Sequence, residues 1–206
     1  DHRTKHGPRH PYRLAPARYK GLIRMSLKAK VEAVSANIDH GFSKVNMDVI
    51  RVVHNYGVEA DAHFGTTVRH LHLIQKDPAQ PNLRQVHLIA LERINEWNVL
   101  GHPVRSGSLG ENITTSGLDL EYLPAGTRMR FGSGAEILLT GLRKPCHQVD
   151  KFSAGLLRLT VSDTKEAEIP YRIGVMGVVL VTGVILKGEG IELFLPPEPH
   201  QSMVKV

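Results

Sequence analysis

One cysteine carries most of the chemical potential of this sequence. Cys146 follows the cations Arg143 and Lys144 in the segment Leu-Arg-Lys-Pro-Cys-His and precedes His147. Thiolate, rather than thiol, is the nucleophile and the metal ligand, and nearby cations stabilise that anion. Pro145 fixes its own φ and makes the turn that carries the sulfur rigid. The pattern indicates a reactive or metal-binding thiol. The alternative is a buried cysteine that behaves as a small hydrophobic residue.

The twelve histidines suggest a second candidate site, for zinc. His70 and His72 lie two residues apart in an alternating segment, so on a strand their rings would face the same side. With His63 and His87 they could supply imidazole ligands to a zinc ion. The sequence has no second cysteine and no His-x-x-x-His or Glu-x-x-His pair beside them. The alternative is therefore that they are surface or hydrogen-bonded histidines.

Two segments that open with glycine could contact a ligand through their loops. Gly107-Ser-Leu-Gly110 could form a concavity of backbone amides for an anion, and residues 57–63 combine two acids with a histidine. The first segment matches neither a Walker loop nor the Rossmann glycine pattern. Ordinary turns are the alternative for both segments. The sequence has no Gly-x-Ser-x-Gly elbow, so serine hydrolase chemistry has no support.

The hydrophobic pattern predicts the elements that must position these residues. Residues 89–100 repeat apolar side chains every three positions and predict an amphipathic helix, which Gly101 and Pro103 end. A shorter helix is predicted over 156–161. Strands are predicted at 30–34, 48–55, 68–74, 85–88, 127–131, 135–142 and 175–186, and the turn 107–113 feeds one more. Together they predict a mainly β fold, a β-barrel with a few inserted short helices and Cys146 near its rim.

Composition bounds the class of protein. A chain of 206 residues predicts one domain of ordinary size. A single cysteine excludes an internal disulfide, so we expect a reducing, cytoplasmic location. The longest apolar run, Val175–Leu186, is shorter than the roughly 20 residues of a membrane span, so we expect no membrane partner.

The net charge of +6 is concentrated at the N-terminus. Seven of the 26 Lys and Arg residues lie within residues 1–24, with one of the 20 acidic residues, and the remaining 19 bases and 19 acids cancel. We therefore predict a disordered basic tail over 1–24, which is not native if Met25 is the natural start, and a folded domain over 25–206. Nucleic acid is not an expected partner of the folded body, because its charge is balanced.

Several segments in order resemble the MOSC family, which is named for the C-terminal domain of molybdenum-cofactor sulfurase. They are residues 110–120 with 123–127, the Arg-x-Pro-Cys motif within 142–146, the segment 57–65, Ser43-Lys44, and the stretches 85–89 and 172–180. Each segment is a weak signal alone, but at least five of them in the family's order and spacing, from about residue 28 to 192, are highly specific. The resemblance is to stand-alone bacterial members. Ala60 stands where the family has glycine.

The resemblance implies a β-rich barrel and a molybdenum cofactor, molybdopterin, whose metal Cys146 ligates. Lys44 and Arg143 would hold the anionic cofactor. The further cofactor-binding residues that it implies are Asp61, His87, Glu111 and Asn112. Pyridoxal phosphate binding is also associated with the family.

Three hypotheses for the function follow. The first is an oxidoreductase that reduces small N-hydroxylated compounds, with a separate electron-donor protein, because one cysteine cannot ligate both molybdenum and a cluster. The second is a sulfur carrier, in which Cys146 takes a persulfide from a cysteine desulfurase for metal–sulfur cofactor assembly. The third is a non-catalytic module that binds an anionic ligand.

Overall fold

The computed structural model describes residues 23–25, 28–69, 74, 75, 77–164 and 167–206. The predicted basic tail lies outside this part for residues 1–22 and stays a prediction there. Its last two residues, Ile23 and Arg24, belong to a strand that pairs with Leu195 and Phe194. His70 and His72 also lie outside it, with most of the predicted strand 68–74. In its described remainder, Val68 and Arg69 belong to no strand and Ile74 is helical. No helix in the described ranges is long and apolar enough to cross a membrane.

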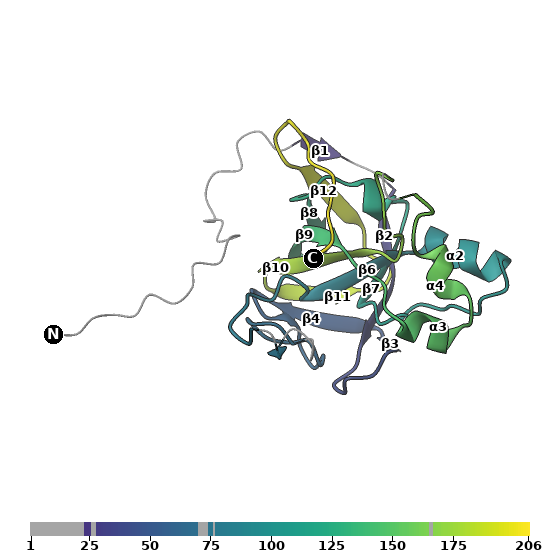
Figure 1. Cartoon of the computed structure of the whole chain (residues 1–206). Coiled ribbons are helices and arrows are strands. Elements are labelled where there is room, and N and C mark those ends of the chain that lie inside the picture. The colour runs from purple at the N-terminus through teal and green to yellow at the C-terminus, as the bar shows by residue number, and fades with distance from the viewer. Residues whose placement is uncertain (1–22, 26–27, 70–73, 76, 165–166) are drawn as a thin grey trace.

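A nine-stranded sheet forms the body of the fold, with the strand order β1-β12-β8-β9-β10-β6-β7-β2-β3 (Figure 1). Its neighbours pair antiparallel except β6 and β7, which are parallel. The strands are β1 (Ile23–Met25), β2 (Lys30–Ala36), β3 (Val45–Met47), β6 (Val86–Ala90), β7 (Ile113–Ser116), β8 (Arg128–Phe131), β9 (Glu136–Leu142), β10 (Val175–Val181) and β12 (Ile191–Leu195).

The sheet curls toward a barrel but does not close into one. Val31 N donates to Glu189 O at 2.9 Å and Ile191 N donates to Ala29 O at 3.0 Å, which links β2 to the start of β12. In the described part no ladder joins the edge strands β1 and β3. The predicted mainly β fold with short helices is confirmed, and the barrel is a curled, open sheet.

A second, three-stranded sheet has the order β11-β4-β5. Its strands are β4 (Val49–Val53), β5 (Gly57–Val58) and β11 (Gly183–Leu186). The single strand predicted over Val175–Leu186 is therefore wrong: the chain leaves the large sheet after Val181 and enters the small one at Gly183. Gly183 makes this crossing possible because a Cβ there would lie 2.9 Å from the Cβ of Ala135.

The helices gather beside one part of the large sheet (Figure 1). They are α2 (Leu91–Val99), α3 (Gln148–Phe152) and α4 (Leu156–Leu159), with the 3-10 turn η1 (Leu120–Tyr122). The predicted helix 89–100 is confirmed as α2, which begins two residues later because Ile89 and Ala90 continue strand β6. The prediction over 156–161 is confirmed as α4, whereas α3 was not predicted.

Two hydrophobic clusters hold the loops that carry the chemistry. The larger one fills the inner face of the curled sheet. The second joins Ile94 and Trp97 of α2 to Val149 of α3, Leu156 of α4 and Ile173 beside β10. Burying a large apolar side chain contributes roughly 1.5–3 kcal/mol. Val149, only three residues from Cys146, is completely buried, and this anchors the cysteine loop to the body.

Candidate functional site

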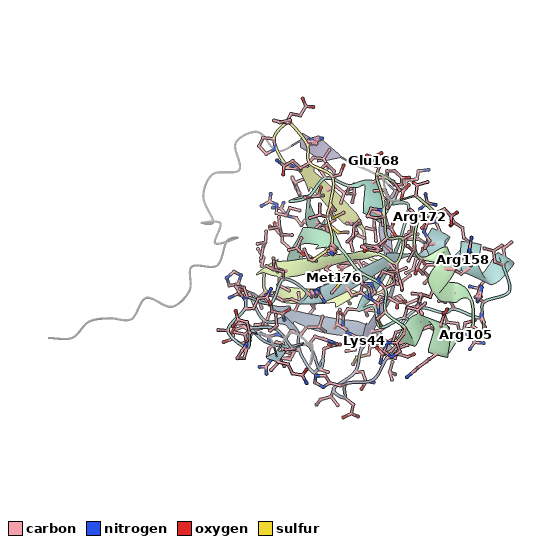
Figure 2. The ribbon with its side chains drawn as sticks, in the orientation of Figure 1. Lys44, Arg105, Arg158, Glu168, Arg172 and Met176 are labelled. Atoms are coloured by element: carbon pink, nitrogen blue, oxygen red, sulfur yellow. The ribbon has the colours of Figure 1, made fainter. Side chains whose placement is uncertain are left out.

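Cys146 lies on the wall of a cavity of about 740 Å³. The wall collects residues from β6, β10, the loop before β3 and the loop after β9. Lys44 and Met176, labelled in Figure 2, come from two of these elements. The polar and apolar side chains that line it include His40, Phe42, Lys44, His63, Arg84, His87, Asn112, Arg143, Lys144, Cys146, His147 and Met176.

The thiol of Cys146 is exposed, so the alternative of a buried cysteine is wrong. Its Sγ lies 3.5 Å from Gln148 Oε1. Two backbone hydrogen bonds hold the loop: Arg143 N donates to Gly174 O at 3.0 Å, and Val149 N donates to Cys146 O at 3.0 Å. Pro145 is buried between them. The loop therefore presents the sulfur to the cavity from a fixed backbone.

Lys44 and Asp61 form a buried ion pair at the side of the cavity. Lys44 Nζ lies 2.6 Å from Asp61 Oδ2, and the two side chains are 5% and 1% exposed. Asp61 also accepts hydrogen bonds from Asn112 Nδ2 at 3.0 Å and from His63 N at 3.0 Å. The donors from His63 and Lys44 lower the pKa of Asp61 despite its burial. Burial lowers the pKa of Lys44, and the charge of Asp61 opposes that shift.

His87 is a buried, neutral wall residue. Its Nε2 lies 2.9 Å from Ile173 O, and because a carbonyl oxygen only accepts, Nε2 carries the proton. Burial, and then the nearby charge of Arg143, lowers the pKa of His87 well below its ordinary value. Asn112 links this residue to the ion pair, since His87 N donates to Asn112 Oδ1 at 3.2 Å. One network thus joins β6 to Asp61.

Glu111 lies behind the wall and closes the glycine turn beside it. Its two carboxylate oxygens accept from Gly107 N at 2.6 Å and from Leu109 N at 3.1 Å. These amides are therefore occupied, and residues 107–110 form an ordinary turn rather than an anion-binding concavity. Burial raises the pKa of Glu111, against the hydrogen bonds of its own turn.

Arg143 brings an unpaired buried donor to the cavity. Its Nη1 is buried and has no hydrogen-bond partner in the described part of the chain, and its guanidinium carbon lies 6.0 Å from the centre of the Phe42 ring. Arg84 is a second cation on the same wall. Burial lowers the pKa of both Arg84 and Arg143. Buried polar atoms in native proteins are nearly always paired. An anionic ligand in the cavity would give Arg143 Nη1 an acceptor.

Six of the seven predicted site residues lie on the wall of this cavity or directly behind it: Lys44, Asp61, His87, Asn112, Arg143 and Cys146. The seventh, Glu111, holds the glycine turn beside the wall. Arg84 was missed because no motif or periodicity marks it: it precedes the predicted strand by one residue. The zinc hypothesis is not supported by His63 or His87, which bond to Asp61 and Ile173 instead. In the described ranges no three His, Cys, Asp or Glu side chains are placed to hold a metal ion.

The residues present fit a sulfur-bound metal group with a negative charge. A thiolate is a soft ligand that suits such a metal, and guanidinium groups bind phosphate through charge-assisted hydrogen bonds. Both are on one wall, and no described residue is a hydrogen-bond partner of Arg143 Nη1. The cavity therefore suits molybdopterin in charge and donor chemistry.

Comparisons with known proteins agree with the fold and the motif order. The model of the MOSC domain matches residues 60–192. A Bacillus subtilis (strain 168) protein, YuaD, named as a candidate metal-sulfur cluster biosynthesis protein, is 27% identical over 180 residues, which are 81% of this chain and 91% of that protein. Its crystal structure has a TM-score of 0.70 at 26% identity and covers 84% of this chain and 98% of its own. The structure of YiiM from Geobacillus stearothermophilus has a TM-score of 0.61 at 17% identity, covering 84% of this chain and 79% of its own, and supports the fold alone.

Proposed function

This chain belongs to the MOSC domain family, and from that premise we propose that it binds the molybdenum cofactor with Cys146 as the metal ligand. One observation carries the proposal: an exposed thiol and an unpaired buried guanidinium donor share the wall of a cavity of about 740 Å³. A sulfur carrier needs an accessible thiol but no cavity of this size. A module that binds only an anion needs the cations but no thiol.

The residues of this chain divide the work of binding. Arg143 and Arg84 would attract and orient the phosphate of the pterin through charge-assisted hydrogen bonds. Lys44 would offer its ammonium as a donor from a fixed place, because Asp61 holds it at 2.6 Å. His87, neutral and bonded to Ile173 O, forms a wall that carries no charge. When bound, the cofactor would supply two-electron reduction.

The proposed reaction is the reduction of an N-hydroxylated compound. The N–O bond breaks, two electrons and two protons are consumed, and the products are the parent amine or imine and water. The electrons come from a separate electron-donor protein. The protein contributes the position of the substrate in the cavity.

The first test is the molybdenum content of the protein purified from a host that makes the cofactor. We expect near-stoichiometric molybdenum, with an equal amount of pterin by fluorescence after oxidation, in the wild type and loss of the metal in Cys146→Ser. Glu59→Gln, an exposed residue paired with Arg51, is the matched control and should retain it. Absence of both metal and pterin from the folded wild type would contradict the proposal. Anion binding that survives in Cys146→Ser without metal would favour the non-catalytic module.

A second function, sulfur transfer, is favoured by the exposure of Cys146 and by the name of YuaD. The thiolate of Cys146 would attack the outer sulfur of a persulfide on a cysteine desulfurase. The donor's S–S bond breaks, a new S–S bond forms on Cys146, and the donor leaves as a thiolate, so no external oxidant is needed. The pyridoxal phosphate implied by the family resemblance would belong to that desulfurase.

The sulfur-carrier function is tested by intact-mass measurement after incubation with a desulfurase and cysteine. We expect a gain of one sulfur atom on the wild type, which mild reduction removes, and no gain on Cys146→Ser. A gain in both proteins, or in neither, would count against Cys146 as the carrier.

A further inference from the structure

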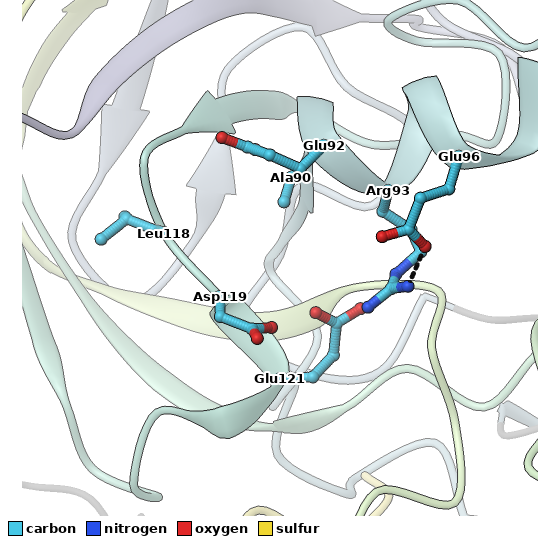
Figure 3. Close-up of a pocket in the computed structure, with 7 residues that line it drawn as sticks. All are labelled: Ala90, Glu92, Arg93, Glu96, Leu118, Asp119 and Glu121. Carbon is cyan, nitrogen blue, oxygen red and sulfur yellow. Dashed lines mark hydrogen bonds and ion pairs between the residues drawn. The ribbon is translucent and has the colours of Figure 1, made fainter. Parts of the chain in front are cut away.

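A second cavity, of about 260 Å³, lies between α2 and η1 and is acidic (Figure 3). Four carboxylates line it around one cation, Arg93. They are Glu92 and Glu96 of α2, Asp119, and Glu121 of η1. None of these residues lines the cavity that contains Cys146.

The cavity carries excess negative charge, because four carboxylates and only one guanidinium line it. Glu96 pairs with Arg93 Nη1, and Arg93 Nε is buried without a hydrogen-bond partner among the described residues. Glu92 Oε1 accepts from the backbone of Gly117 at 2.7 Å, which satisfies one oxygen but does not neutralise the group. Asp119 is exposed at the rim. A cation entering here would meet attraction from several directions.

Glu121 supplies an independent observation that points to a ligand. The residue is only 1% exposed, and its Oε2 is buried without a hydrogen-bond partner among the described residues, although it borders the cavity. Its other oxygen, Oε1, accepts from Gly174 N at 3.1 Å. Burial raises the pKa of Glu121, and the charge of Arg93 opposes that shift. Buried polar atoms are nearly always hydrogen-bonded, so the unpaired Glu121 Oε2 indicates that a ligand in the cavity supplies the donor.

We propose that this acidic cavity binds an organic cation, an alkylguanidinium or alkylammonium group, whose N–H groups donate to Glu121 Oε2 and to the rim carboxylates. Ala90 and Leu118 supply apolar wall for the methylenes of such a ligand. A metal ion fits less well, because in the part of the chain that is described no three acidic, His or Cys side chains are placed to hold one. The cation can belong to a free small amine or to a Lys or Arg side chain of a partner protein.

The cavity is linked to the cysteine loop through one residue. Gly174 N donates to Glu121 Oε1, while Gly174 O accepts from Arg143 N at 3.0 Å. A donor that binds Glu121 Oε2 polarises the carboxylate and so alters the hydrogen bond that Glu121 Oε1 accepts from Gly174 N. The amide signal of Gly174 is therefore a sensitive reporter of occupancy.

The test is a titration of the ¹⁵N-labelled full chain, followed by the signals of Gly174 N–H and Arg93 Nε–H. Agmatine, an alkylamine with a guanidinium group, is the small-molecule probe, and N-acetyl-arginine amide presents the side chain as a protein would. N-butylurea is the uncharged control. We expect saturable shifts with the cations and none with the urea. Preference for agmatine identifies a free amine as the source, and equal binding of the capped arginine identifies a partner's side chain.

Two variants decide between the proposal and simple charge attraction. Glu121→Gln keeps an oxygen for Gly174 N but removes the charge, and should weaken binding at least about tenfold. Glu59→Gln removes a charge elsewhere and should bind as the wild type does. Equal affinity in Glu121→Gln and the wild type would overturn the proposal. So would shifts that never saturate in the wild type, because the cavity would then hold only water.

Discussion

Lys44 and Asp61 form an ion pair that is almost fully withdrawn from water, with Nζ 2.6 Å from Oδ2. It ties the loop before β3 to the turn after β5. Asn112 Nδ2 donates to the same oxygen at 3.0 Å, so the start of β7 joins the same point. The pair positions one side of the cavity that Cys146 faces, and its loss should affect both stability and binding.

Replacing Asp61 with alanine should destabilise the fold by about 3–5 kcal/mol, because the ammonium of Lys44 would remain buried without its counter-charge. Urea unfolding followed by circular dichroism measures the change. Arg51 and Glu59 form an exposed pair at 2.9 Å and provide the control: Glu59→Ala should cost less than about 1 kcal/mol. Similar losses for the two variants would refute a special role for the buried pair.

The stability that Asp61 contributes should vanish in acid. Its hydrogen bonds from His63 and Lys44 lower the pKa of its carboxyl below the ordinary value of 3.8. A group with a lowered folded pKa stabilises fully above its unfolded pKa and loses that contribution as the pH falls toward the folded pKa. Melting temperatures of the wild type and Asp61→Asn should differ by a constant amount above about pH 5 and converge below about pH 4. A gap that persists unchanged to about pH 2 would contradict this assignment.

Any side chain at Gly174 should destabilise the fold, because it would collide with the backbone of strand β6. A Cβ there would lie 2.0 Å from Leu88 O, and φ is +85°. Gly188 has a similar φ of +88° with nothing near its Cβ position, so Gly188→Ala measures the backbone strain alone, about 1–2 kcal/mol. Gly174→Ala should lose clearly more stability than Gly188→Ala in the same urea experiment. Equal losses would mean that strand β6 moves aside freely.

Replacing Ala60 with glycine should increase the stability of the fold. Its φ of +60° lies in the left-handed region, where an L-residue is strained by about 1–2 kcal/mol. Glycine relieves that strain but adds about 0.4–1 kcal/mol of unfolded-state entropy, so Ala60→Gly should gain about 0.5–1 kcal/mol. Asn55, with a φ of +61°, is the control, and Asn55→Gly should gain less, since asparagine adopts this region more readily. A loss of stability in Ala60→Gly would show that its methyl group packs usefully.

The folded protein should react with one equivalent of a thiol reagent such as Ellman's reagent without denaturant, because Cys146 is exposed. Protein loaded with the cofactor should react much more slowly, since the sulfur would then be a ligand. Wild-type protein stripped of metal is the control and should react at the fast rate. Slow labelling of the stripped protein would place the thiol out of reach and contradict its position on the cavity wall.

The sequence alone determined the local features of this protein, namely the exposed thiol and the helices and strands with a clear pattern. The cations and proline before Cys146 indicated a presented thiol, and the structure places it exposed on a cavity wall. The three-residue repeat of Leu91, Ile94 and Trp97 predicted α2, because a helix must bury one face. Runs of strand-forming residues bounded by turns predicted β2, β4 and β9. The conformation of Ala60 also follows its motif, which has glycine at that place in the family.

Only the tertiary structure decided which residues meet. The parallel pairing of β6 with β7 places His87 beside Asn112, and the ion pair of Lys44 with Asp61 joins two loops. Arg84 is placed on the cavity wall, and Glu121 Oε2 is buried without a hydrogen-bond partner among the described residues. No local sequence pattern encodes either property. The division of 175–186 into two strands depends on Ala135, distant in sequence, lying against Gly183. Periodicity reports the face that a segment buries, whereas the identity of its neighbours depends on packing between segments, and that is set by the whole chain.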